Sequence, residues 1–224
     1  MKYIISIVLT LTFAIQAAGQ NKQQSDYGVS DPKAAKILSD MSAKYKALNS
    51  IKASIKLTIE SPEDDFKEEM SGSIFLKGSK YKLELGDQEI TCDNKTMWTY
   101  LKDVNEVTID NYEEDGDIMN PKDIFTMYES GFIYGFINEK TEGGRIIQVI
   151  DLTPTDKTKP FFKVRLNIDK VKKEIISAVI FDKNGNHYTY EVSNFVANPG
   201  LRDAFFTFEL SKHPGIEVVD LRDF

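Results

Sequence analysis

The chain has 224 residues, with 28 basic and 35 acidic side chains and a formal net charge of -7 at pH 7. This balance argues against nucleic-acid binding, because proteins that bind nucleic acids neutralise phosphates with a surface rich in Lys and Arg. A single cysteine excludes an intramolecular disulfide, so a hydrophobic core must stabilise the fold.

The first residues are typical of a secretory signal. Lys2 precedes an apolar run from Ile4 to Ile15, and small residues at 17–19 precede Gln20. The alternative is a membrane anchor, but about a dozen apolar residues are fewer than the ~20 that a span requires. We therefore expect a cleaved signal peptide over residues 1–19. Because Gln20 rather than a cysteine follows it, we expect no lipid anchor on the mature chain.

One domain is expected after this signal. Residues 20–30 are polar and predict a disordered lead, and residues 31–224 contain no evident linker or repeat. Asp31 and Pro32 are typical of a helix start, with a capping carboxylate followed by proline at the first helical position. Apolar residues then recur at helical spacing, which predicts an amphipathic helix over about 32–48.

The hydrophobic period then changes from helical to two, which indicates half-buried strands. Regular spacing, with turn residues between the segments, favours an antiparallel meander. The predicted strands cover residues 53–60, 70–76, 81–85, 89–92, 96–101, 106–109, 146–152, 162–168, 174–181, 187–195 and 216–221.

Residues 122–138 differ from this pattern. They follow a second cap-and-proline pair, Asn120 and Pro121, and are apolar at most positions. We predict a short helix or a pair of helices packed across an apolar surface. Such helices could cover a cavity above a curved sheet, or could fill its core, and periodicity alone favours the filled core.

No arrangement of residues argues for catalysis or for a metal centre. His187 and His213 lie beside predicted turns and lack companions at ligand spacing. Cys92 lies on a predicted strand and is better explained as a small buried residue than as a nucleophile. We therefore expect no enzyme activity, no metal and no cofactor.

An ordered set of short motifs resembles the periplasmic outer-membrane lipoprotein carrier family of the LolA type. The motifs are Gly72-Ser73-Ile74-Phe75-Leu76-Lys77, Tyr81-Lys82-Leu83-Glu84, Cys92-Asp93-Asn94-Lys95-Thr96-Met97-Trp98-Thr99-Tyr100, Glu106-Val107, Leu152-Thr153-Pro154, Phe206-Thr207-Phe208 and Pro214-Gly215-Ile216-Glu217-Val218. Each motif alone is weak, but they follow the family's order over nearly the whole mature chain.

The resemblance implies a mainly β fold with helices (α+β): an unclosed antiparallel β-barrel covered by a helical lid, with an apolar cavity between them. It implies a periplasmic carrier that binds the acyl chains of lipoproteins without a chemical reaction. Its implied partners are acylated lipoproteins, an inner-membrane release complex and an outer-membrane acceptor, and we expect a monomer. A regulatory module that senses lipids or lipoproteins with the same half-barrel is the alternative.

The residues expected to line the cavity come from the sheet and from the predicted lid. They are Ile37, Leu38, Met41, Leu76, Tyr81, Leu83, Leu85, Trp98, Tyr100, Phe125, Met127 and Tyr128. Each could equally belong to a filled core.

One turn departs from the family pattern. The family often has Arg followed by Pro after its first pair of strands, where the Arg helps to hold the lid, and this chain has Gly78-Ser79 between Lys77 and Lys80. Lys80 or Lys82 could take that role, although lysine cannot form the bidentate hydrogen bonds of arginine.

Overall fold

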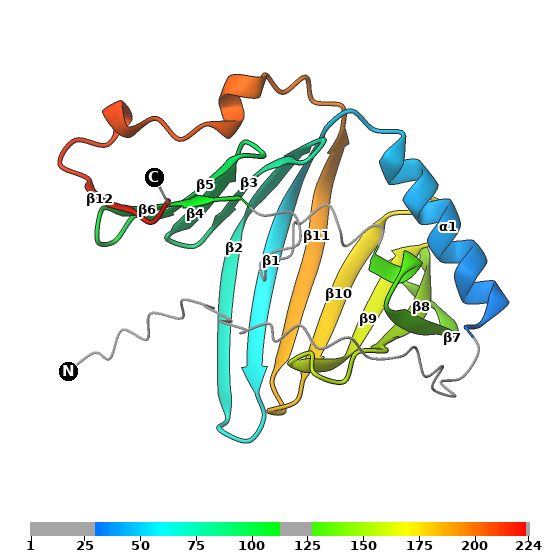
Figure 1. The fold of residues 1–224 in the computed structure, drawn as a ribbon. Coiled ribbons are helices and arrows are strands. Elements are labelled where there is room, and N and C mark those ends of the chain that lie inside the picture. Colours follow the sequence, from blue (N-terminus) through cyan, green and yellow to red (C-terminus); the bar gives the residue numbers. More distant parts are fainter. Residues whose placement is uncertain (1–29, 113–126, 223–224) are drawn as a thin grey trace, which may run out of the picture.

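The computed structural model describes residues 30–112 and 127–222 of the chain. These residues form a single curved sheet of twelve strands, with the α-helix α1 against one end of it (Figure 1). The strand order is β12-β6-β5-β4-β3-β2-β1-β11-β10-β9-β8-β7, so the two edges β12 and β7 do not pair with each other. The sheet is therefore an unclosed barrel, as the sequence resemblance implied.

The helices and strands have the following bounds: α1 Pro32–Lys46, β1 Ile51–Ser61, β2 Phe66–Lys77, β3 Lys80–Leu85, β4 Gln88–Cys92, β5 Thr96–Leu101, β6 Glu106–Asn111, η2 Met127–Glu129, β7 Phe132–Glu142, β8 Arg145–Pro154, β9 Phe161–Asp169, β10 Ile175–Asp182, β11 His187–Ala197, η3 Asp203–Phe206, η4 Leu210–Lys212 and β12 Glu217–Asp220.

The predicted N-terminal helix is confirmed, and it ends at Lys46, two residues before the predicted end. The Asp31 carboxylate caps it by accepting a hydrogen bond of 2.7 Å from the backbone N–H of Lys33, and Pro32 occupies the first turn. The second Asp31 carboxylate oxygen accepts from the backbone N–H of Phe136 in β7 at 3.2 Å. One side chain thus starts the helix and fixes it to an edge strand.

The predicted strands are also confirmed, except that the sheet is not antiparallel throughout. β12 pairs in parallel with β6, with Glu217 opposite Glu106. The chain reaches this position after η3 and η4, which carry it back across the sheet from the end of β11 (Figure 1). A long return of this kind permits a parallel pair, which a short turn cannot form.

The helical prediction for residues 122–138 is wrong over residues 132–138. Residues 132–138 belong to strand β7, which pairs with β8, and only Met127–Glu129 form a short 3₁₀ helix. The left-handed Gly131 (φ 76°) separates the two segments. The misassignment arose because apolar residues occupy both faces of the strand, which hides the period of two. Residues 122–126 lie outside the described part of the chain.

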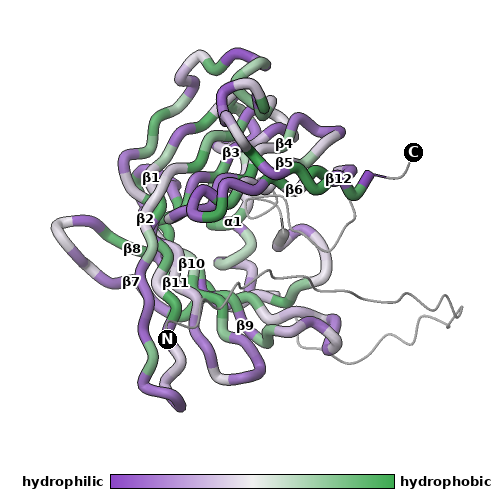
Figure 2. The backbone as a smooth tube through the Cα atoms, turned by 90° about the vertical axis from the view of Figure 1, so that its left-hand side faces the viewer, coloured by the Kyte–Doolittle hydropathy of each residue, from purple (hydrophilic) through white to green (hydrophobic). Residues whose placement is uncertain are grey.

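The sheet has two apolar clusters, one on each face. The larger lies on the concave face and includes the buried side of α1, and Figure 2 shows the strands curving around the interior in which α1 is seen. The smaller contains Tyr100, Val107, Ile109 and Phe208. It lies on the convex face near the β12 edge.

The C-terminal half of α1 is fixed to β10 by buried and half-buried contacts. The Tyr45 hydroxyl accepts a buried hydrogen bond of 3.0 Å from the backbone N–H of Ile175. The Lys44 ammonium lies 2.7 Å from the Glu174 carboxylate and donates to the Lys172 carbonyl at 2.7 Å. The helix is thus positioned over the β7–β10 end of the sheet.

We predict that Tyr45→Phe lowers the free energy of unfolding by about 1–3 kcal/mol, because it leaves the buried N–H of Ile175 without this acceptor. Urea unfolding followed by circular dichroism measures the change. Tyr188→Phe is the matched control, since Tyr188 is half-buried and its hydroxyl bonds only to side chains, to Asp182 at 3.5 Å and to Asn186; we expect a change within about 0.5 kcal/mol. Equal losses in both variants would contradict the assigned role of Tyr45.

Gly72 in β2 generates a second stability prediction. A Cβ atom added there would lie 1.7 Å from the backbone carbonyl oxygen of Glu84 in the neighbouring strand β3. Gly72→Ala must therefore push two paired strands apart, and we expect a loss of about 2 kcal/mol or more in urea unfolding. Gly135→Ala is the control, because no heavy atom lies within 4 Å of its added Cβ. A Gly72→Ala variant as stable as Gly135→Ala would disprove the close approach.

Candidate functional site

The concave face presents apolar side chains in register across adjacent strands. From β7 to β2, one row places these residues side by side: Phe136, Ile150, Leu166, Ala178, Tyr190, Leu57 and Met70. The next row contains Tyr134, Leu152, Val164, Ile180, Tyr188 and Ile59. Because side chains alternate between faces along each strand, these rows form one continuous apolar surface.

The same face continues over β2, β3 and β4. Ile74 in β2 lies opposite Leu83 in β3, which in turn lies opposite Ile90 in β4. In the neighbouring row, Leu76 lies opposite Tyr81, and Tyr81 lies opposite Cys92. Tyr81 and Cys92 are almost fully buried, whereas Leu83 and Ile90 are half-buried. The surface is therefore closely packed near one end of these strands and more accessible towards the middle of the sheet.

The helix α1 covers only part of this surface. Leu38 and Met41 are fully buried in the same cluster as Ile150, Leu152 and Leu166. Towards the centre of the sheet, Ile55, Ile59, Leu83 and Leu85 are only half-buried. Burial raises the pKa of the Tyr190 hydroxyl between these two regions, which is consistent with a poorly hydrated environment.

The short helix η2 also contacts α1. The Glu129 carboxylate at the end of η2 lies 2.6 Å from the Lys46 ammonium and accepts from the buried Ser42 hydroxyl at 3.3 Å. The pKa of Glu129 is lowered, first by its hydrogen bond with Lys46. Tyr128 lies edge-on to Tyr134 in β7, with ring centroids 6.0 Å apart.

Most of the residues predicted to line a cavity do meet on the concave side. Those that the structure brings together on or beside one apolar cluster are Ile37, Leu38, Met41, Leu76, Tyr81, Leu83, Leu85 and Tyr128. Met127 begins η2, next to Tyr128. Phe125 lies outside the described residues. Whether these positions contact a ligand stays a prediction.

Trp98 and Tyr100 are not brought together with the others. Trp98 lies opposite Thr91, and Tyr100 opposite Glu89, so both point to the convex face. There Tyr100 packs against Phe208, with ring centroids 5.3 Å apart, and against His213 at 4.6 Å. These two aromatic residues belong to the convex cluster, and we do not assign them to the concave surface.

The lysines that flank the Gly78-Ser79 turn form their ion pairs on the convex face of the sheet. The ammonium groups of Lys77 and Lys80 lie 2.8 and 3.2 Å from the Asp203 carboxylate, and both lower the pKa of Asp203. Lys82 pairs with Glu89 at 2.8 Å. Lys77 and Lys80 therefore hold the C-terminal segment, and not α1, against the sheet. Lys82 forms its ion pair with a residue of the sheet itself.

Sequence reasoning missed the part of the surface that β7 to β11 provide. Phe136 lies in a segment whose sequence predicts a helix. The strands that contain Ile150, Leu166 and Tyr190 are predicted, but their sequence does not show that they lie beside this site. The period-two alternation of Tyr188, Tyr190 and Val192 was the available signal. It shows that one side of β11 is apolar, but only the pairing shows which strands lie beside it.

The described residues offer no obvious reactive centre. His213 stacks on Phe208, His187 lies edge-on to Phe181, and Cys92 is buried. Over 30–112 and 127–222, no group of three or more His, Cys, Asp or Glu side chains is placed to hold a metal ion. In the same ranges, no helix has the length and apolarity needed to cross a membrane.

Comparison with known proteins agrees with this architecture. An uncharacterized protein of Methanocaldococcus jannaschii is 28% identical over 213 residues, covering 92% of this chain and 58% of that protein. An outer-membrane lipoprotein carrier protein of Histophilus somni is 31% identical over 136 residues, covering 61% of this chain and 62% of the relative. The chain thus spans about three fifths of the length of these curated relatives.

A solved structure shares the fold. An uncharacterized conserved protein from Thermus thermophilus superposes with a TM-score of 0.56 at 14% identity, over 83% of this chain and 98% of that one. The sequence family described as outer membrane lipoprotein carrier protein LolA matches residues 34–180, which include α1 from Ala34 onward and most of the concave rows. Because this match covers more than half of the sequence, the chain belongs to the LolA family of outer membrane lipoprotein carrier proteins.

Proposed function

We propose that this protein is a periplasmic carrier that binds the acyl chains of lipoproteins non-covalently on its concave face and conveys them from the inner to the outer membrane. The observation that supports this function best is the apolar row that runs through seven adjacent strands, from Phe136 in β7 to Met70 in β2. A surface of this length suits an extended hydrocarbon chain better than a compact ligand.

The free-energy cost of exposing an acyl chain to water explains why a carrier needs such a surface. Each methylene group removed from water contributes about 0.8 kcal/mol, so a chain of a dozen methylenes costs about 10 kcal/mol to expose. Leu83, Leu85, Ile55 and Ile59 are half-buried and could shield such a chain. Binding by burial alone needs no reaction, and release needs only a competing apolar surface.

The helix α1 acts as the lid in this proposal. It buries Leu38 and Met41 on the same surface that the acyl chain would use. Its displacement would expose Ile150, Leu152 and Leu166 and extend the binding surface. Methionine suits such a position because its flexible side chain adapts to chains of different shape.

The proposed route involves a donor and an acceptor. The secretory signal predicted over residues 1–19 would place the protein in the periplasm, and the relative from Histophilus somni is named as an outer-membrane lipoprotein carrier. We therefore propose that an inner-membrane release complex supplies the acylated lipoprotein and that an outer-membrane receptor accepts it. No enzymatic step is part of this function.

We expect the purified mature protein to extract a triacylated lipoprotein from inner-membrane vesicles into soluble form. Its unacylated counterpart should gain nothing from the carrier, because it has no chain to bury. Sedimentation of the vesicles followed by immunoblotting of the supernatant measures both. Equal transfer of the two forms would refute acyl-chain binding.

We predict that Leu83→Glu reduces this extraction at least tenfold, because it places a charge on the half-buried apolar surface. The matched control is Val179→Glu, which adds the same charge at a half-buried position on the convex side of β10, opposite Arg165. We expect near-normal extraction from it. Circular dichroism confirms folding, and a folded Leu83→Glu variant with full activity would exclude this surface.

A further inference from the structure

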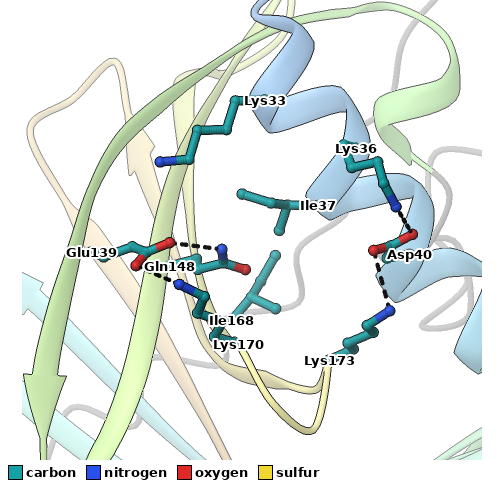
Figure 3. A pocket seen from close by; sticks show the side chains of 9 residues that line it. All are labelled: Lys33, Lys36, Ile37, Asp40, Glu139, Gln148, Ile168, Lys170 and Lys173. Carbon is teal, nitrogen blue, oxygen red and sulfur yellow. Dashed lines mark hydrogen bonds and ion pairs between the residues drawn. The ribbon is translucent and has the colours of Figure 1, made fainter.

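A cleft of about 650 Å³ opens between the N-terminal half of α1 and the ends of β7, β8 and β9, within the usual range for ligand sites. Figure 3 shows its walls formed by charged side chains around a floor of Ile37 and Ile168. The charged and polar residues that line it are Lys33, Lys36, Asp40, Glu139, Gln148, Lys170 and Lys173.

The cleft is cationic although the chain as a whole is acidic. Four lysines face two carboxylates, which leaves an excess of two positive charges in a protein of net charge -7. The Asp40 carboxylate is bridged by Lys36 at 2.7 Å and Lys173 at 3.1 Å. An anion entering the cleft would therefore meet acidic groups that are already neutralised.

Glu139 on the opposite wall is similarly occupied. Its carboxylate lies 2.8 Å from the Lys170 ammonium and accepts from the Gln148 amide at 3.0 Å. The Lys33 ammonium lies 3.4 Å from the centre of the Phe136 ring. Its charge also helps to lower the pKa of Glu139 and of Asp31, so it adds to the positive potential of the cleft.

The lysines, rather than the helix end, supply this positive potential. α1 starts beside the cleft, but the Asp31 carboxylate already caps its first turn. That carboxylate offsets the partial positive charge at the N-terminal end of the helix. The geometry of Lys33 and Lys36 therefore favours a negatively charged occupant.

The cleft also borders the apolar face where α1 covers it. Gln148 and Ile168 pair with each other, two residues beyond the paired and fully buried Ile150 and Leu166 of the concave row. Ile168 belongs to the large apolar cluster and Ile37 packs against it. With α1 displaced, one surface would change from apolar to cationic at this end, which matches a molecule with a hydrocarbon chain and an anionic head.

We propose that this cleft binds the phosphate group of an anionic lipid whose acyl chains lie on the concave face. Lysine binds phosphate as a point charge, and four lysines around one opening suit it. The position of the chains rests on the proposed function, whereas binding of the phosphate group does not. A soluble phosphate ester presents the same chemistry and is separated from a lipid by the test.

The experiment compares three probes by isothermal titration calorimetry: dioctanoyl phosphatidylglycerol, dioctanoylglycerol and glycerol phosphate. We expect the first to bind at least tenfold more tightly than the second, and this advantage to shrink at high salt because exposed charges are screened. We expect glycerol phosphate to bind most weakly. Equal affinity for the two lipids would overturn the proposal, and glycerol phosphate binding as tightly as the charged lipid would overturn its lipid part.

Variants in the cleft test the assignment in both directions. Lys33→Gln combined with Lys173→Gln should abolish the advantage of the charged lipid, while Glu139→Gln should increase it by releasing Lys170. The control is Lys95→Gln combined with Lys102→Gln, an equal charge change at exposed positions beside the strands β4 to β6, and it should retain the advantage. Equal effects of the two double variants would show that only net charge matters and would refute the site.

The outcomes also separate this inference from the carrier function. If both lipids bind equally, the phosphate site fails and acyl-chain binding stands. If only the charged lipid binds and its affinity is independent of chain length, the phosphate site stands and the apolar surface fails. Dihexanoyl phosphatidylglycerol, with shorter chains and the same head group, provides that comparison.

Discussion

The register of the sheet is the constraint on which the rest of the structure depends. Side chains alternate between the two faces of a strand, so a slip of one residue would move a whole apolar set to the other side. The pairing of Leu57 with Tyr190 and Met70 joins the β7–β11 part of the concave surface to the β2–β4 part. The surface on which α1 packs and the proposed acyl-chain surface both depend on this register.

The two faces of this sheet are protected differently, and the difference indicates where a ligand can bind. On the convex side, Phe206 and Phe208 from the C-terminal segment are buried, and Asp203 is held by Lys77 and Lys80. That segment completes a small permanent core. On the concave side, in the part of the chain that the structure describes, α1 covers part of a much longer apolar surface, and residues such as Leu83 are half-buried. A surface that is apolar but incompletely covered can accept a hydrocarbon without unfolding the domain.

Local patterns in the sequence predicted the elements well and their partners poorly. The Asp31 cap, Pro32 and the apolar stripe predicted α1, and the period of two predicted nearly all the strands, since both signals act within a few residues. They failed in β7, where Phe132 to Ile137 are apolar on both faces. They also could not place Trp98 and Tyr100, because alternation defines two faces without showing which one lies inside. That choice depends on Phe208 and His213, more than 100 residues along the chain.

The helix α1 is held unevenly along its length, and this bears on how a lid could open. Its C-terminal half is fixed by the buried bond between Tyr45 and Ile175 and by the half-buried pair of Lys44 with Glu174. The N-terminal half contributes the buried Ala34 and Leu38 to the core, and its polar contacts with the sheet are the Asp31 bond to Phe136 and the pair of Asp40 with the half-exposed Lys173. Exposed ion pairs contribute at most about 1 kcal/mol each, and buried hydrogen bonds cost more to leave unmade. The polar contacts of the N-terminal half therefore cost less to break than the buried bond of Tyr45, and its separation from the sheet would mainly expose Ala34 and Leu38. An anion that attracts Lys173 away from Asp40 would remove the ion pair that links this half to the turn between β9 and β10, so occupancy of the cleft would act on the same contacts that hold the lid.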